Sequence, residues 1–156
     1  MLKAGLIVGG ITLVLGLIGG FVFPLLCIPC VALFAGTGAG YLAGQFDRPG
    51  LNNTAVANGA KAGAIAGVGA LLAHIIAGLA GAAALGPQGA AEMMSQFGLP
   101  ADPGNPMVYY GSAFGAACCF GLFEIALMAG TGALGGVLWF NTAGKSQGGV
   151  PPAPAV

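Results

Sequence analysis

The chain has 156 residues, of which 57% are hydrophobic and only 5% are charged, with four Lys/Arg balancing four Asp/Glu. Nucleic-acid binding needs a basic face and intrinsic disorder needs low hydrophobicity, so this composition excludes both classes. So few charged residues cannot solvate the surface of a soluble domain of this length, which leaves an integral membrane protein.

Four apolar runs, each of about 20 residues or more, are candidates for membrane-spanning helices. In chain order they cover about 4–23, 26–45, 59–85 and 108–140. A proline-containing outer loop, 86–107, separates the last two runs, and within it residues 90–97 can form a short interfacial helix. We therefore predict an all-α fold, a four-transmembrane-helix bundle that forms a single transmembrane domain over 1–142. A disordered cytoplasmic tail, 143–156, is expected to follow it.

The basic residues predict the orientation of these spans. Cytoplasmic flanks of membrane helices carry an excess of Lys and Arg. With four spans, all four basic residues fall on one side, namely Lys3, Arg48, Lys61 and Lys145. Three spans would separate Lys145 from the others. We expect an integral protein of the bacterial cytoplasmic membrane with both termini in the cytoplasm.

Two short strings recur along the chain. Residues 3–9 match residues 61–67 at five of seven positions, and the string AGTGA occurs at both 35–39 and 129–133. Such spacing predicts two tandem helical hairpins related as parallel repeats. The KAG-x-I-x-G string and the hydropathy profile resemble those of small, uncharacterised Gly-rich four-helix bacterial membrane proteins built from tandem hairpins. That resemblance implies a fold and no activity.

Glycine is abundant, with 31 residues, and recurs at intervals of four inside the apolar runs. Small residues at this spacing line one helix face and let backbones approach closely in membranes. Two unbroken triplets are the main candidates for helix packing: Gly36, Gly40, Gly44 and Gly59, Gly63, Gly67. They favour a structural or accessory multi-pass subunit that packs in a homo- or hetero-oligomeric complex. Its expected partners are membrane lipid and other integral subunits or itself, without nucleic acid.

Two ionisable residues lie deep in the predicted spans. Tyr110 and Trp139 are the expected interfacial anchors of the fourth span, about 43 Å apart at 1.5 Å per residue. Glu124 lies midway between them, where an ionised carboxylate is costly. His74 lies about 20 Å from Lys61 along the third span. Whether His74 and Glu124 touch stays open. The pair supports two hypotheses, a proton- or solute-conducting channel or carrier and a structural interhelical hydrogen bond.

A CxxC pair, Cys27 and Cys30, lies at the predicted outer end of the second span, where a disulfide is able to form. Its position resembles that in the quinone-coupled disulfide-generating enzymes of bacterial membranes and raises a third hypothesis, a membrane thiol-disulfide oxidoreductase. Those enzymes carry a second Cys pair in the second outer loop, whereas 86–107 contains none and Cys118 and Cys119 lie inside the fourth span. The sequence otherwise lacks catalytic and metal-binding motifs, so we predict no enzyme activity, no cofactor and no metal site.

Overall fold

The computed structural model describes residues 1–22, 28–96 and 105–145. All elements in these ranges are helical, and the described residues contain no strand. The helices are α1 (Leu2–Val22), α2 (Ile28–Asp47), α3 (Asn52–Gln96), α4 (Pro106–Trp139) and the π-helix η1 (Phe140–Gly144). The predicted all-α class is therefore confirmed.

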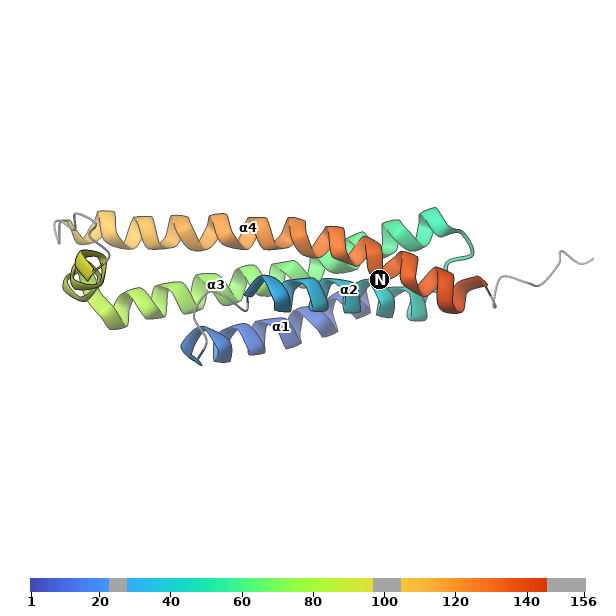
Figure 1. Ribbon diagram of the computed structural model, residues 1–156, viewed down its shortest axis with the longest axis horizontal. Coiled ribbons are helices and arrows are strands. Elements are labelled where there is room, and N and C mark those ends of the chain that lie inside the picture. Colours follow the sequence, from blue (N-terminus) through green and yellow to red (C-terminus); the bar gives the residue numbers. More distant parts are fainter. Residues whose placement is uncertain (23–27, 97–104, 146–156) are drawn as a thin grey trace, which may run out of the picture.

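The bundle is elongated, and its helices differ in length. α3 and α4 lie antiparallel along the whole molecule, whereas α1 and α2 cover only the end at which the N-terminus lies (Figure 1). At 1.5 Å per residue the 34 residues of α4 extend about 51 Å, against about 32 Å for the 21 residues of α1. The molecule thus has a four-helix part and an outer hairpin, which we define as residues 80–96 of α3 and 106–115 of α4.

α3 differs most from the sequence prediction. The third span was expected at 59–85, but the helix begins at Asn52 and continues to Gln96 across a kink. Gly86 makes the kink with φ 65° and ψ 172°, a conformation open to glycine, and Pro87 suits the first turn of the segment that follows. Helical structure thus extends into the predicted outer loop 86–107, where a short helix was expected only at 90–97. The segment after the kink is seen nearly end-on in Figure 1, so it turns across the bundle axis.

The two ends of α4 are defined by local hydrogen bonds. At its start, the Oδ1 atom of Asn105 accepts a hydrogen bond from the backbone N–H of Met107 over 2.9 Å, which caps the helix. At its end the helix continues without a break into η1. The predicted tail 143–156 therefore begins too early, because helical structure continues through Gly144, and residues 146–156 lie outside the described residues.

Equivalent strings of the two repeats lie side by side. α1 runs parallel to α3, and a Cβ atom added at Gly9 would lie 3.2 Å from Ala66 Cα. α2 runs parallel to α4, where a Cβ at Gly36 would lie 2.8 Å from the carbonyl oxygen of Met128. Small residues permit both close approaches, as expected for helices that pack without a hydrophobic driving force.

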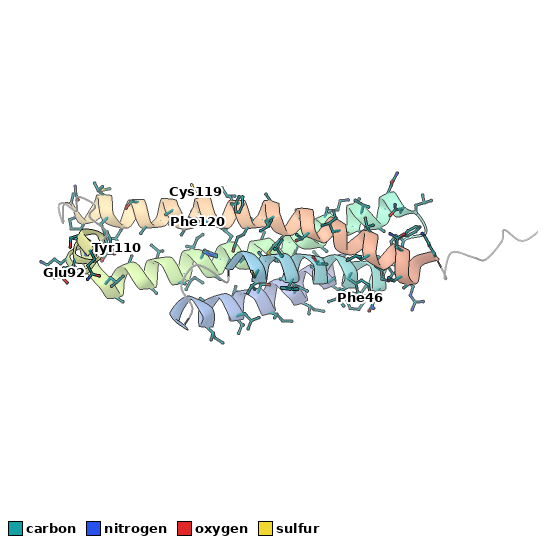
Figure 2. The ribbon with its side chains drawn as sticks, in the orientation of Figure 1. Phe46, Glu92, Tyr110, Cys119 and Phe120 are labelled. Atoms are coloured by element: carbon teal, nitrogen blue, oxygen red, sulfur yellow. The ribbon has the colours of Figure 1, made fainter. Side chains whose placement is uncertain are left out.

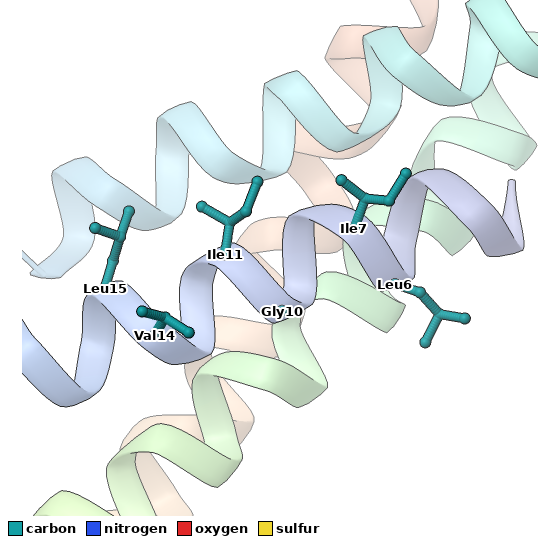
Figure 3. A pocket seen from close by; sticks show the side chains of 6 residues that line it. All are labelled: Leu6, Ile7, Gly10, Ile11, Val14 and Leu15. Atoms are coloured by element: carbon teal, nitrogen blue, oxygen red, sulfur yellow. The ribbon is translucent and has the colours of Figure 1, made fainter.

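The outside of the bundle is apolar and the inside is made of small residues. The buried residues are mainly alanine, whereas large side chains such as Phe34 and Phe123 are 81% and 65% exposed. An apolar groove on the outer face of α1 follows the same pattern (Figure 3); it is lined by Leu6, Ile7, Gly10, Ile11, Val14 and Leu15. A soluble core helix would bury its apolar residues, so this distribution suits contact with lipid rather than water.

Two stretches are long and apolar enough to cross a membrane, Asn52–Glu92 in α3 and Pro106–Gly144 in α4 with η1. Only 22% of the most apolar 18-residue window of each is buried. The apolar stretch Leu2–Ile18 of α1 is shorter. Length and composition thus support membrane integration for two helices.

Charged groups gather at the end of the bundle where α1 begins. The α-amino group of Met1 pairs with the Asp47 carboxylate, and Asn58 Nδ2 donates to the same oxygen over 3.4 Å. We call this the charged end, and its basic residues are Lys3, Arg48, Lys61 and Lys145. Glu92 lies at the opposite, outer end with Tyr110, far from Phe46 of α2 (Figure 2).

Candidate functional site

The structure brings together the two ionisable residues found in the apolar runs. His74 of α3 and Glu124 of α4 face each other, with His74 Nδ1 3.2 Å from Glu124 Oε2. Glycines allow this approach of the two helices. A Cβ atom at Gly121 would lie 3.0 Å from Leu71 Cα, and one at Gly67 would also meet the backbone of the facing helix. The contact between His74 and Glu124, which the sequence left open, is therefore present.

The carboxylate of this pair is buried without full hydrogen bonding. Glu124 is 6% exposed, and within the described part of the chain its Oε2 atom has no hydrogen-bond partner. His74 Nδ1 lies 3.0 Å from the carbonyl oxygen of Ala70 as well as 3.2 Å from Glu124 Oε2, so a hydrogen on Nδ1 has two acceptors within reach. A buried acceptor left without a donor is costly and rare in folded proteins. Glu124 Oε2 is thus positioned to receive a proton or a donor group.

The pair lies closer to the outer end of α1 than to the charged end. A Cβ atom at Gly16 would lie 2.8 Å from Ala73 Cβ, so His74 is about level with residue 17 of α1. The end of α1 at Val22 is then about 8 Å away along the axis, whereas Lys61 is about 20 Å away. Relative to α3 and α4 alone, the pair is central.

Trp139 differs from the sequence prediction, which used it as one of two interfacial anchors to place Glu124 midway across the membrane. It was expected as an interfacial anchor, but it is only 2% exposed and packs against α2 at Gly44. The absent side chain of Gly44 makes room for the indole, which therefore fills the four-helix part. At the other end, Tyr109 and Tyr110 form an edge-to-face pair with ring centroids 5.1 Å apart. The Tyr109 hydroxyl donates to the Ala82 carbonyl oxygen over 3.3 Å and joins the helices of the outer hairpin.

Both glycine triplets contact α4 within the chain. A Cβ atom at Gly40 or at Gly59 would collide with the carbonyl oxygen of Gly132, and one at Gly63 would collide with that of Met128. α2 and α3 thus lie backbone to backbone against the same stretch of α4. Because their atoms are already in contact inside the bundle, these glycines do not present an outer face to another protein.

The three cysteines in the described residues are free thiols and form no disulfide with one another. Cys30 is exposed in the first turn of α2, and the predicted disulfide to Cys27 lies outside the described residues. Cys118 and Cys119 are free thiols on α4, and Cys119 points away from the bundle (Figure 2). Over residues 1–22, 28–96 and 105–145, no group of three or more His, Cys, Asp or Glu side chains is arranged to hold a metal ion.

Sequence reasoning overlooked Met128, which follows Glu124 by one helical turn on the same face of α4. Met128 is fully buried and contacts both glycine triplets. The four-residue spacing from Glu124 is the signal that identifies it, because residues four apart on a helix are neighbours.

The chain matches no protein family model, no curated protein and no solved structure.

Proposed function

We propose that the protein spans the membrane four times, with both termini in the cytoplasm of a bacterial cell. The 21 and 20 residues of α1 and α2 match a hydrocarbon core of about 30 Å. The exposed apolar side chains and the basic residues at the charged end support the same topology. In that arrangement the outer hairpin extends beyond the hydrocarbon on the outer side, because α3 and α4 are longer than the core is thick.

Single-cysteine labelling tests this topology. In a variant that keeps only Cys27, a membrane-impermeant maleimide should react from the outer side of intact cells. In a cysteine-free background, Gln88→Cys should also react from outside, and Asn53→Cys only after the cells are opened. Labelling of Cys27 from the cytoplasmic side alone would contradict four spans, because α1 and α2 would then not cross the bilayer.

We further propose that the His74–Glu124 pair takes up and releases a proton, so that the protein belongs to the proton-handling class of membrane proteins. The observation that supports this role is the buried Glu124 Oε2 atom, which lies 3.2 Å from an imidazole nitrogen and to which no described residue donates a hydrogen bond. Histidine titrates near neutral pH and exchanges protons at both ring nitrogens. An ionisable pair inside apolar helices is typical of proton relays and ion sites.

Infrared difference spectroscopy tests proton uptake directly. When the pH is lowered and raised again, the C=O stretch of a protonated carboxyl group in an apolar environment should appear and disappear reversibly in the wild type. Glu124→Gln should abolish this band, whereas Glu92→Gln, at an exposed position in the outer end, should retain it. A wild-type spectrum without a titrating band sensitive to Glu124→Gln would refute the proposal.

An accessory role in a membrane complex is the second candidate, and a different surface supports it. Gly111 and Gly115 lie in the outer hairpin on α4, one turn apart, and a Cβ atom at either would meet nothing within 4 Å. Unlike the two triplets, this pair leaves a flat face of the outer hairpin available to a second copy or to another subunit of the complex.

Gly115→Leu should therefore weaken association without unfolding the protein. We expect self-association in lipid vesicles, measured by energy transfer between labelled copies, to fall about tenfold, which corresponds to about 1.4 kcal/mol. Gly10→Leu is the matched control, because Gly10 of α1 is equally unobstructed. Equal association of the wild type and both variants would exclude this face as a contact between copies.

A further inference from the structure

We infer that protons reach the His74–Glu124 pair from the outer end of the bundle only, because packing around Met128 closes the path toward the charged end. This inference rests on the proposed proton uptake and adds a direction to it. It makes the pair a proton-binding site with access from one side, and not part of a conducting channel.

The path toward the charged end is closed one helical turn from Glu124, at Met128. Met128 is 0% exposed, and α2 and α3 contact its backbone from both sides through Gly36 and Gly63. A Cβ atom at Gly36 would lie 3.0 Å from Met128 Cα, closer than almost all real Cβ contacts. Backbones this close leave no space for a water molecule between the helices.

Buried hydroxyl groups do not bridge this region either. Thr131 is the next buried polar residue of α4, seven residues or about 10 Å from Glu124. Its hydroxyl group donates to carbonyl oxygens of its own helix, 3.0 and 3.3 Å away. Thr12 of α1 likewise donates to Val8 O over 2.7 Å. Proton transfer needs hydrogen-bond partners about 3 Å apart, and the described residues supply none across this gap.

The outer side of the pair is less covered. His74 exposes 25% of its side chain, against 8% for Glu124. α2 begins at Ile28, which is about level with Phe120 and so one turn beyond Glu124 toward the outer end, because Gly36, eight residues later, contacts Met128. Beyond the start of α2, the described residues on the outer side of the pair belong to α3, α4 and the end of α1. His74 is therefore the more accessible partner.

The imidazole ring suits a relay between the outer side and Glu124. When Nε2 gains a proton from outside, the cation releases the proton on Nδ1 to Glu124 Oε2, 3.2 Å away. The ring then returns to its neutral form with the hydrogen on Nε2, and the carboxyl group is protonated. One proton enters and one is transferred, so no other reactant is needed.

Cys30 of α2 is the described titratable group closest in level to the pair, because the contact of Gly36 with Met128 makes it about level with Leu122. The other described titratable groups lie farther away along the helices. On α1 the described titratable groups are Lys3 and the Met1 amino group, both at the charged end. α2 has Cys30 in its first turn and Tyr41 and Asp47 toward the charged end, and α3 has Lys61 and Glu92. On α4 they are Tyr109, Tyr110, Cys118 and Cys119, all toward the outer end.

Sided pH jumps on vesicles of uniform orientation test the inference. Vesicles of neutral phospholipid are sorted by capture of a C-terminal tag, and the carboxyl band of Glu124 is followed after the pH is changed on one side. We expect the band to respond to the outer face at least tenfold faster than to the charged end. Met128→Gly should remove this difference, and Leu134→Ala, at an exposed position of α4, should retain it.

The outcomes separate the two proposals. A wild-type band that responds equally from both faces would overturn one-sided access and leave proton uptake intact. A band that is absent, or unchanged by Glu124→Gln, would refute proton uptake itself. The comparison of the two faces uses the wild type, so it stands even if Met128→Gly does not fold. Proton leak through wild-type vesicles should equal that through Glu124→Gln vesicles.

Discussion

Gly132→Ala should destabilise the bundle by about 3 kcal/mol or more, at the upper end of the range for overpacked cores. A Cβ atom at this position would collide with the carbonyl oxygen of Gly59 and lie 3.0 Å from Gly63 Cα. Gly132 is also the residue on which Gly40 of α2 packs. The added methyl group would meet backbone atoms, which cannot rotate away as a side chain does, so a helix must move.

Gly130→Ala is the control for this variant. It lies on the same helix two residues earlier, where a Cβ atom would meet nothing within 4 Å. Alanine there should leave stability unchanged or raise it by up to about 1 kcal/mol through its higher helix propensity. Loss of helical circular dichroism during titration with sodium dodecyl sulfate measures both variants. Equal stability of the two would show that α2 and α3 do not contact α4 at Gly132.

His74→Leu should lower the unfolding free energy by about 3 kcal/mol, because it leaves the Glu124 carboxyl group buried without the imidazole that lies 3.2 Å from it. The double variant, His74→Leu with Glu124→Leu, should be nearly as stable as the wild type, since it removes both ionisable groups from the apolar interior. The two substitutions should therefore be strongly non-additive.

The single and double variants form a double-mutant cycle, and its coupling energy distinguishes a charged from a neutral interaction between His74 and Glu124. We expect about 2 kcal/mol, as for hydrogen bonds that involve a charged group. Neutral interhelical hydrogen bonds in membranes average only about 0.6 kcal/mol. A coupling at or below that value would indicate a structural hydrogen bond between α3 and α4. Ser112→Leu, at an exposed position of α4, should add to His74→Leu without coupling.

The arrangement around Met128 gives these proposals a common physical basis. Glycine triplets bring α2 and α3 into backbone contact with α4 on the side toward the charged end. The same packing stabilises the bundle and excludes water between Glu124 and the charged end. α2 begins about one turn beyond Glu124 toward the outer end, so the described residues do not repeat farther out the contacts that close the inner half.

The helical class and the approximate spans follow from the sequence alone. Long apolar runs that contain glycine must satisfy their backbone polar groups internally if they lie in lipid, and only helices do so within one segment. The start of α4 near residue 108 and the end of α2 near residue 45 were expected within two residues, because polar and proline-containing stretches bound them. The extension of α3 past Gly86 was not expected, since a Gly-Pro step usually ends a helix and here bends it.

The partners of each residue were decided only by the tertiary structure. Glycines at intervals of four predict a flat helix face, but not which helix lies on it, and both triplets proved to face α4. Tryptophan is typical of a membrane interface, yet the Trp139 side chain is buried in the bundle, where the absence of a side chain at Gly44 leaves space for it. The distance of His74 from Glu124 likewise depends on the rotation and register of two helices. Periodicity along one helix carries no information about its rotation relative to a neighbour, which is fixed by how all four surfaces fit together.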